Sequence, residues 1–220
     1  MNKTILVVAL LSTSSLLSTG AGVLPYTFNQ YGERIYLIGW QPHKKSFSDF
    51  GGGAEKCDNE NLYYTACREF HEETFNTFIN QNVDTQTYLH RIYKAGNQYR
   101  MYFSKVHWTD ADKLTQIRRN MKKAPRGAEP TRFIWIPEHE LEQALIYANQ
   151  NNTNYGIVIK HTARDGQKYD LALHSAFVSL LRFGTDIHGN IGFGSLKYTL
   201  KEPASSSSAS SSSTQTIHCK

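Results

Sequence analysis

The 220-residue sequence has only three cysteines, Cys57, Cys67 and Cys219. They form no C-x-x-C pair and have no Cys/His spacing typical of zinc, which excludes a disulfide-rich scaffold and a structural zinc module. In an oxidising compartment Cys57 could pair with Cys67, and two free thiols are an equal alternative. The sequence also lacks internal repeats, a Walker-type loop and a G-x-S-x-G element, which excludes solenoids and the enzyme classes built on those two motifs.

Neither sign of charge is in large excess. The chain has 24 lysines and arginines against 19 aspartates and glutamates, a formal net charge of +5 and a pI of about 9.0. That balance gives mild attraction to polyanions without the long basic stripe of a dedicated nucleic-acid binder. A small phosphorylated molecule suits this charge equally well, and nucleic acid is the less favoured partner. The hydrophobic share of 40% is enough for one folded domain with tails.

The apolar run at residues 5–17 is too short to span a bilayer. Lys3 precedes it and the small residues 18–21 follow it, which is the order of a secretory signal peptide. We therefore predict a signal peptide over residues 1–21, a secreted or periplasmic protein, and no membrane span after cleavage. The alternative is the first strand of a cytoplasmic protein, because polar residues at 12–15 interrupt the run.

The folded domain is predicted to occupy residues 22–200, with residues 201–220 as a tail. Serine dominates the tail. Because such a segment has no apolar surface to offset the entropy lost on ordering, we expect it to be disordered.

Residue patterns predict an α+β fold. Strands bounded by turn signals are expected at residues 23–28, 34–40, 86–94, 98–107, 133–137 and 156–161. Helices are expected at residues 110–120 with Asp110 as N-cap, at 138–150 and at 169–183. The nearly continuous apolar character of residues 34–40 predicts burial on both faces of that strand. Residues 187–200 fit neither pattern.

Three carboxylates carry the strongest chemical signal. Glu69, Glu72 and Glu73 stand at i, i+3 and i+4, so a helix places them on one face. Like charges at that spacing destabilise an isolated helix by roughly a few tenths of a kcal/mol per pair unless a cation lies among them. Clustered carboxylate oxygens are the ligands that Mg²⁺ prefers. The pattern predicts a metal-binding helix, and the alternative is a solvated acidic face.

With its flanking residues, this pattern resembles the Nudix box, G-x5-E-x7-R-E-U-x-E-E-x-G-U, in which U is a bulky apolar residue. The matching stretch is residues 51–75, GGGAEKCDNENLYYTACREFHEETF. Gly52 takes the place of the opening glycine, and seven residues separate Glu60 from Arg68, as the box requires. The positions after Arg68 also match, namely Glu69, Phe70, Glu72 and Glu73.

The stretch departs from the box in three places. The loop from Gly52 to Glu60 is two residues longer, the second glycine position holds Phe75, and the final apolar position holds Asn76. Because the residue after the helix commonly needs a positive φ, the missing glycine weakens that turn, although Asn76 tolerates the conformation. None of these departures removes a predicted metal ligand.

The resemblance implies a Nudix-like α/β/α sandwich with a mixed central sheet and a Glu-rich catalytic helix that binds Mg²⁺ or Mn²⁺. The metal ligands that it implies are Glu69, Glu72 and Glu73. Arg68 belongs to the catalytic set and is best interpreted as structural, paired with Glu60, with Asp58 as the next partner if the inserted residues move Glu60 out of reach. Glu129 precedes a Trp-containing strand, where a glutamate of Nudix domains approaches the metal, so either Glu72 or Glu129 is the expected general base.

Basic residues beside the box are the predicted substrate contacts: Lys44, Lys45 and Arg126, with a solvated loop as the alternative for the two lysines. The basic stretch 109–128 is longer than the loop of ordinary Nudix domains, and it is either a specificity element or a solvated helix. The resemblance implies a hydrolase that cleaves a diphosphate linkage in a nucleoside diphosphate derivative. The alternatives are a Nudix-fold binding module without catalysis and, less favoured, a pyrophosphohydrolase of RNA caps or 5′ ends.

Overall fold

The computed structural model describes residues 19–78, 81, 83–93, 96–122, 129–163, 166–198 and 200. The predicted tail and the first 18 residues of the predicted signal peptide lie outside the described residues. The last three residues of that peptide form the start of the first strand, where they pair with two other strands. No helix in the described ranges is long and apolar enough to cross a membrane.

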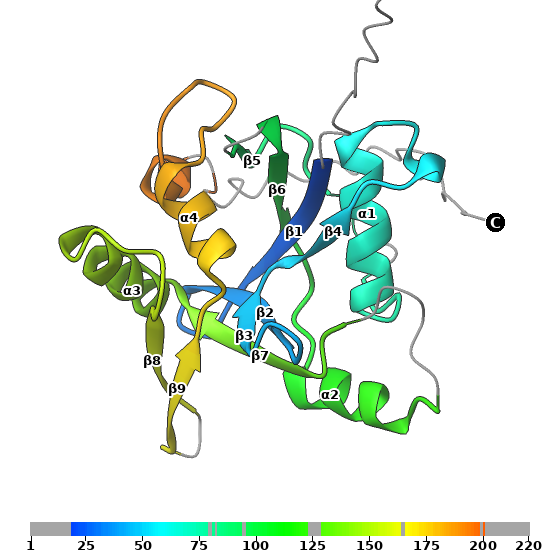
Figure 1. Ribbon diagram of the computed structural model, residues 1–220. Helices are drawn as coiled ribbons and strands as arrows, with labels where there is room; N and C mark the ends of the chain where they lie inside the picture. Colours follow the sequence, from blue (N-terminus) through cyan, green and yellow to red (C-terminus); the bar gives the residue numbers. More distant parts are fainter. Residues whose placement is uncertain are drawn as a thin grey trace, which may run out of the picture.

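One seven-stranded sheet forms the centre of the fold (Figure 1). Its strands are β1 (Thr19–Phe28), β2 (Arg34–Gln41), β3 (Ser46–Ser48), β4 (Phe50–Gly53), β5 (Tyr88–Ile92), β6 (Gln98–Lys105) and β7 (Arg132–Pro137). The main path runs β3-β2-β1-β6-β5, while β4 also pairs with β1 and β7 with β2. β1 and β6 run parallel, and the other strand pairs of this sheet are antiparallel. The sheet is therefore mixed, as predicted.

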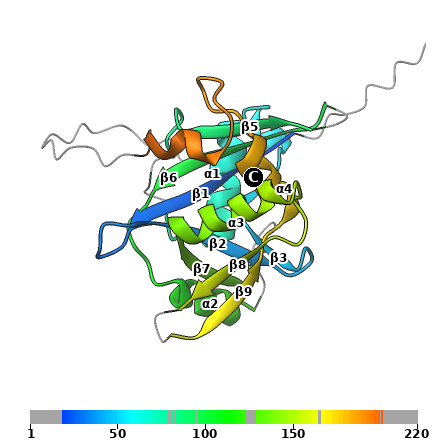
Figure 2. The same ribbon diagram turned by 90° about the vertical axis from the view of Figure 1, so that its left-hand side faces the viewer.

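Helices cover both faces of the sheet (Figures 1 and 2). On one face, α1 (Leu62–Glu73) packs on β1 and β4, and α2 (Ala111–Asn120) packs on β7. On the other face lie α3 (Glu138–Gln150) and α4 (Ser175–Phe183). Between these two helices the chain forms a separate two-stranded sheet from β8 (Val158–Thr162) and β9 (Lys168–Ala172). The predicted α/β/α sandwich of the α+β class is confirmed.

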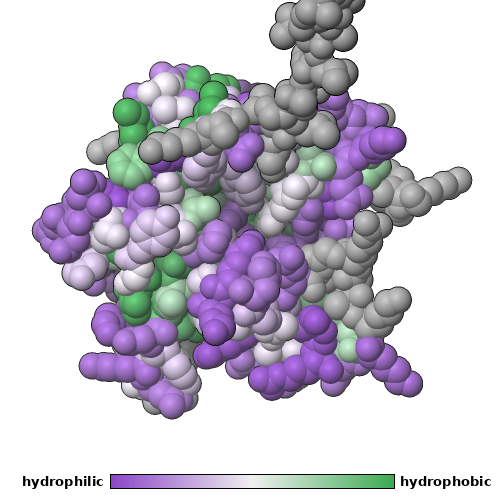
Figure 3. Space-filling model, in the orientation of Figure 1, coloured by the Kyte–Doolittle hydropathy of each residue, from purple (hydrophilic) through white to green (hydrophobic). Residues whose placement is uncertain are grey.

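Alternate residues of the inner strands enter two separate cores. On β1, Leu24 packs in the core under α3 and α4, whereas Val23 packs in the core under α1 and α2. Tyr36 and Leu37 of β2 alternate in the same way. Because successive side chains point to opposite faces and helices cover both, the predicted two-face burial of residues 34–40 is confirmed. With the apolar side chains in these cores, most of the surface seen in Figure 3 is hydrophilic.

The helix predicted for residues 169–183 is wrong in its first part. Lys168–Ala172 form β9, which runs antiparallel to β8, and α4 begins only at Ser175. Along β9 the exposed Asp170 alternates with the buried Leu171, which is a strand period of two rather than a helical period. A short apolar run of this kind does not distinguish strand from helix by sequence alone.

Residues 187–200, which no pattern had assigned, contain a 3-10 helix at Phe193–Tyr198. Phe193 and Leu196 are buried in the core beside α3 and α4. The rings of Phe193 and Tyr36 meet edge to face with centroids 5.4 Å apart. The segment therefore completes the packing of this core.

Candidate active site

The loop before α1 is fixed by an ion pair between Asp58 and Arg68. The Nε and Nη2 atoms of Arg68 donate to the two carboxylate oxygens of Asp58 at 3.0 and 2.9 Å. Asp58 is fully buried and also accepts hydrogen bonds from the Glu55 N–H and the Thr65 hydroxyl. Burial by itself would raise the pKa of Asp58, but the hydrogen bonds and the charge of Arg68 outweigh it and hold that pKa below its usual value.

The prediction that Glu60 is the partner of Arg68 is wrong. Glu60 is exposed and forms a left-handed turn with Asn59, with φ of 59° and 50°. Asp58 stands at the box spacing from the opening glycine, Gly52-x5-Asp58, with aspartate in place of glutamate. The two extra residues therefore follow the acid instead of preceding it. Counting back from Arg68 found the wrong acid, whereas counting forward from Gly52 finds the right one.

Two of the three predicted metal-binding carboxylates of α1, Glu69 and Glu73, lie against β4. Glu73 accepts a hydrogen bond from the Gly51 N–H at 2.9 Å. Glu69 and Glu72 both accept from Nη1 of Arg68, at 2.9 and 3.3 Å. Glu72 is the most exposed of the three, with 32% of its side chain accessible to solvent. The helix thus holds two carboxylates against the strand and one toward solvent.

Gly52 makes room for one of these carboxylates. A Cβ atom at Gly52 would lie 2.5 to 2.8 Å from the carboxylate atoms of Glu69, closer than real Cβ contacts. At the next residue, Gly53, a Cβ would meet nothing within 4 Å. The opening glycine of the box therefore has a steric role, because a side chain there would displace Glu69 from the β4 backbone.

Burial and mutual repulsion favour the protonated forms of these carboxyl groups. Burial raises the pKa of Glu69 to about 7, although Arg68 acts to lower it. Burial also raises the pKa of Glu73 well above its usual value, and the charges of Glu69 and Asp49 add to the effect. The pKa of Glu72 is raised by burial as well. The group is short of positive charge, which a divalent cation would supply.

Glu129 acts electrostatically on one of these carboxylates. Burial is the main cause of the raised pKa of Glu73, and the charge of Glu129 contributes to it. Oε2 of Glu129 is 3.4 Å from Nε2 of His43, and about half of each side chain is exposed. Glu72, a member of the group, and Glu129, which acts electrostatically on Glu73, are therefore both open to solvent.

Within the described part of the chain, no three histidine, cysteine, aspartate or glutamate side chains already form a group that could hold a metal ion. Nη1 of Arg68 lies between Glu69 and Glu72 and neutralises part of their charge. The donor set nevertheless fits a hard divalent cation, since it consists of carboxylate oxygens on one helix face with too little positive charge. Binding would require these glutamates to exchange Arg68 for the cation.

The end of α1 is a tight turn without glycine. The Asn76 N–H donates to the His71 carbonyl at 2.8 Å and the Phe75 N–H to the Glu72 carbonyl at 3.3 Å, which is the Schellman pattern. Phe75 and Asn76 have φ of 56° and 57°, a conformation that costs a residue other than glycine about 1–2 kcal/mol. An edge contact between the rings of Phe75 and Phe133 offsets part of that cost. Asn76 thus adopts the positive φ that it was expected to tolerate, and Phe75, at the glycine position of the box, adopts one as well.

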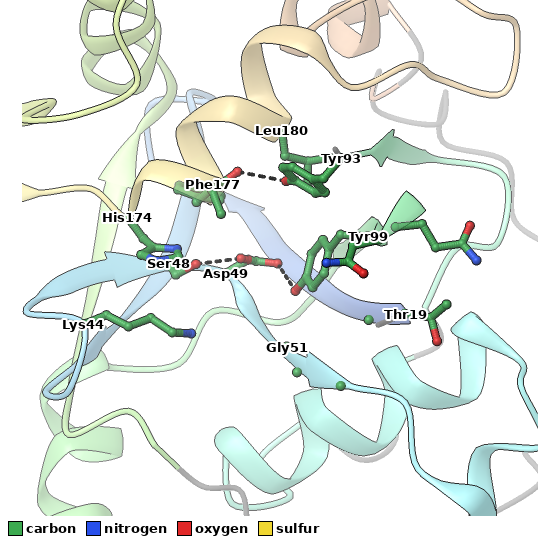
Figure 4. Close-up of a pocket in the computed structure, with 16 residues that line it drawn as sticks. Thr19, Lys44, Ser48, Asp49, Gly51, Tyr93, Tyr99, His174, Phe177 and Leu180 are labelled. Atoms are coloured by element: carbon green, nitrogen blue, oxygen red, sulfur yellow. Dashed lines mark hydrogen bonds between the residues drawn. The ribbon is translucent and has the colours of Figure 1, made fainter. Parts of the chain in front are cut away.

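A cavity of about 260 Å³ lies beside β4 on the sheet face that α4 covers (Figure 4). The backbone of residues 51–53 forms one wall, so the cavity shares this strand with the carboxylates of α1. Asp49 and Tyr99 lie at its centre, with Lys44 and His174 to one side. Its apolar wall is made by Tyr93, Phe177 and Leu180.

Of the three predicted substrate contacts, only Lys44 is placed at this cavity. Lys45 is exposed in the turn between β2 and β3, with a φ of 49°, and Arg126 lies outside the described residues. The described part of the stretch 109–128 contributes no lining residue, because α2 packs on β7. That packing favours the solvated-helix interpretation for α2.

Sequence reasoning missed Asp49, Tyr99 and His174. Strand pairing and the start of α4 bring them together from distant parts of the chain, and no motif marks them. The position of Asp49 just before the glycine run of β4 is the one local signal.

Neither expectation for Cys57 and Cys67, a disulfide between them or two free thiols, is met. Cys57 is part of a disulfide, whereas Cys67 has a free thiol, so the two do not pair with each other and are not both free. Burial raises the pKa of the Cys67 thiol to about 11. Since the thiolate is the nucleophile, Cys67 is unreactive at neutral pH.

No protein-family model matches the sequence, and no curated protein matches it. Solved structures that resemble the fold include an Ap4A hydrolase from C. elegans, with 17% identity over 60% of this chain and 87% of that chain and a TM-score of 0.43. Another is the Nudix hydrolase RenU from M. smegmatis, with 15% identity over 57% and 74% of the chains and a TM-score of 0.38. A third is the NUDIX domain of Shewanella oneidensis NrtR, solved with ADP ribose, with 13% identity over 62% of this chain and 88% of that chain and a TM-score of 0.40.

Two of these three structures carry the name of the family that residues 51–75 resemble. At such identities and TM-scores we take no activity, metal or substrate from them. The Nudix interpretation of the site rests on Gly52, Asp58, Arg68 and the glutamates of α1.

Proposed function

We propose that the protein is a metal-dependent Nudix-type hydrolase that cleaves a diphosphate linkage in a nucleoside diphosphate derivative. The observation that carries this proposal is the arrangement around α1. Asp58, at the box spacing from Gly52, anchors Arg68, and Arg68 in turn contacts Glu69 and Glu72. The carboxylates are thus concentrated where the box places them.

The residues that would hold Mg²⁺ or Mn²⁺ are Glu69, Glu72 and Glu73. When bound, the cation would polarise phosphoryl oxygens and lower the pKa of a bound water. The Gly51 N–H fixes the orientation of Glu73.

The other residues of the site orient groups and transfer a proton. Arg68 is a positioning residue, because its side chain is buried and tied to Asp58 while it contacts Glu69 and Glu72. Glu72 and Glu129 are the candidates for accepting a proton from the attacking water, since both are open to solvent and Glu129 acts electrostatically on Glu73. Lys44, at the edge of the cavity, is placed to contact a phosphate of the substrate.

A Nudix-fold binding protein without catalysis is the second candidate. The observation that favours it is the contact of Arg68 Nη1 with both Glu69 and Glu72. The positive charge of Arg68 reduces the repulsion between these two carboxylates, so the helix does not require a metal ion. An RNA-end substrate gains no support from the described residues, because α2 contributes nothing to the cavity.

Hydrolysis of a substrate panel separates the two candidates. Nucleotide sugars, dinucleotides and capped RNA are incubated with the protein, with and without Mg²⁺, and release of phosphate or nucleoside monophosphate is measured. The hydrolase proposal expects Mg²⁺-dependent release that Glu72→Gln removes and that the exposed control Glu60→Gln retains. Binding of a ligand without any release would establish the binding protein instead.

Export by a signal peptide is our proposal for the location of the protein. A cut after residue 21 would remove Gly20 and Ala21, which pair with Gly53 and Gly52 of β4, so the strand stays complete only with an earlier cut. N-terminal sequencing of protein made in an exporting host tests this, and an intact Met1 would contradict it.

A further inference from the structure

Asp49 is a buried carboxylate that the proposed chemistry does not use. It is 4% exposed and lines the cavity beside β4 (Figure 4). The Ser48 hydroxyl donates to its Oδ1 and the Tyr99 hydroxyl to its Oδ2, each at 2.8 Å. Among the described residues, none forms an ion pair with it. Because each carboxylate oxygen accepts about two hydrogen bonds, Asp49 has acceptor capacity left for a ligand.

The backbone leaves space for this carboxylate and its tyrosine. A Cβ atom at Gly22 of β1 would lie 2.7 Å from Oδ2 of Asp49, and one at Gly51 of β4 would overlap the Tyr99 hydroxyl. A side chain at either position would displace the pair. Two neighbouring strands therefore carry glycine where Asp49 and Tyr99 meet, which shows that the strands are shaped around the pair.

The cavity has two chemically different ends. Lys44 and His174 lie on one side of Asp49, where they can face a phosphate (Figure 4). Tyr93 and Leu180 lie on another side and present an apolar wall. A phosphate placed against Asp49 itself would be repelled by a like charge, so the group that fits there carries hydrogen-bond donors and no negative charge.

The size of the cavity limits what it holds. Its volume of about 260 Å³ is just below the range of about 300–1,000 Å³ typical of sites for whole small molecules. It therefore accommodates one ring-containing part of a substrate. The phosphates would then lie at its edge, beside Lys44 and along the glycine strand that leads to α1.

We propose that this cavity binds the nucleoside part of the substrate and that Asp49 determines specificity by accepting hydrogen bonds from its N–H or O–H groups. The inference rests on the hydrolase proposed above. A base edge with amino or imino groups and a ribose diol both present such donors. If the bound part of a ligand has no N–H or O–H group, it covers the Asp49 carboxylate without donating a hydrogen bond to it. The free energy lost in this way discriminates strongly between ligands.

Direct binding in EDTA tests the inference without requiring hydrolysis. The full chain is titrated calorimetrically with the four ribonucleoside 5′-monophosphates, with the 2′,3′-dideoxy analogue of the tightest binder, and with pyrophosphate. Asp49→Asn should weaken the tightest nucleotide by about tenfold or more, because an amide presents a donor to a donor. Pyrophosphate affinity should change by less than about twofold, since no phosphate contacts Asp49.

Two further variants keep the test interpretable. Asp170→Asn is the matched control, since Asp170 is exposed on β9 and pairs with Lys160, and it should leave every affinity unchanged. Ala176→Leu adds bulk at an exposed rim position of the cavity and should weaken all four nucleotides, but not pyrophosphate, even if Asp49→Asn fails to fold. A preference among the bases that Asp49→Asn removes assigns the donors to the base. Weaker binding of the dideoxy analogue assigns them to the ribose.

Unchanged nucleotide affinity in folded Asp49→Asn, or in Ala176→Leu, would overturn the inference, and so would the absence of nucleotide binding by the unmodified protein. Nucleotide binding that depends on Asp49, without hydrolysis of the panel, would remove the hydrolase proposal and leave the cavity assignment standing. Hydrolysis with a KM that Asp49→Asn does not change would support the hydrolase proposal and remove the assignment of the cavity.

Discussion

The N–H of Gly51 donates a hydrogen bond to Oε2 of Glu73 at 2.9 Å. The same residue has no side chain on the face where the Tyr99 hydroxyl holds Asp49. One residue of β4 therefore contacts both the carboxylate helix and the cavity. A substrate that spans the two sites would cross a single strand.

Gly52→Ala should damage the carboxylate site, whereas Gly53→Ala should not. A Cβ at position 52 overlaps Glu69, while one at position 53 meets nothing within 4 Å. We expect Gly52→Ala to destabilise the protein by about 1–3 kcal/mol, the cost typical of overpacking, and to weaken Mn²⁺ binding. Denaturant titration and Mn²⁺ binding measured by electron paramagnetic resonance check this. Equal effects of the two alanines would contradict the steric role of Gly52.

A double-mutant cycle should show strong coupling between Asp58 and Arg68. Asp58→Ala and Arg68→Ala should each cost about 3–5 kcal/mol of unfolding free energy, because each leaves a buried charge without its partner. The double variant should lose less than the sum, by about 0.5–3 kcal/mol. Urea unfolding of the four proteins measures the coupling.

Glu60→Ala is the control for that cycle and should stay within about 0.5 kcal/mol of the unmodified protein, since Glu60 is exposed. Additive losses for Asp58 and Arg68, together with a large loss for Glu60→Ala, would restore the pairing that the box spacing alone suggested.

Metal-free protein should become less stable as the pH rises from about 4.5 to about 7. Burial raises the pKa of Glu69 from 4.5 to about 7, so the folded state holds this proton at a pH where the unfolded chain has lost it. The contribution is complete below the unfolded pKa and is lost as the pH rises through the folded pKa, with a change of at most about 3 kcal/mol. The lowered pKa of Asp58 acts at lower pH.

Urea midpoints in EDTA across this range measure the effect, and Glu69→Gln should flatten it. A protein whose stability increases with pH in that window, or a Glu69→Gln variant with the same slope as the unmodified protein, would show that Glu69 is not held as the geometry indicates.

Divalent metal should stabilise the protein through the glutamates of α1. A ligand that binds only the folded state adds about 2.7 kcal/mol at a concentration one hundred times its Kd, so Mg²⁺ or Mn²⁺ should raise the Tm. Glu73→Gln should remove most of that increase, because Glu73 is held at the glycine strand by the Gly51 N–H. Differential scanning calorimetry with and without EDTA measures it, and a Tm increase that Glu73→Gln retains would exclude this residue as a ligand.

Local signals predicted the secondary structure where those signals are strong. α3 spans Glu138–Gln150 as predicted, and Asp110 caps α2 by accepting a hydrogen bond from the Asp112 N–H at 2.9 Å. Caps and helical periods depend on a few neighbouring residues, so the sequence contains them. Residues 169–172 were misassigned because their neighbours along the chain do not decide between helix and strand, and the pairing with β8 does.

The candidate site could be predicted only in part for the same reason. Arg68 and the glutamates of α1 stand within one helix, and their spacing is visible in the sequence. Sequence reasoning ranked Glu60 before Asp58 because the turn at Asn59 and Glu60 changes the count without moving Asp58 out of reach. Asp49 and Tyr99 are 50 residues apart and meet only because β1 pairs with both β4 and β6.

The position of β1 in the sheet also bears on how the chain folds. Its parallel partner β6 ends at Lys105, after the whole of α1 has been made. Until that residue has left the ribosome, one edge of β1 has no partner, even though β2 and β4 can pair early with the other. Non-local parallel pairing is slow because the loop must close before any contact is gained. β1, the first strand of the described residues, is therefore among the last to be completed, and its unpaired edge stays available to other chains until β6 has been made.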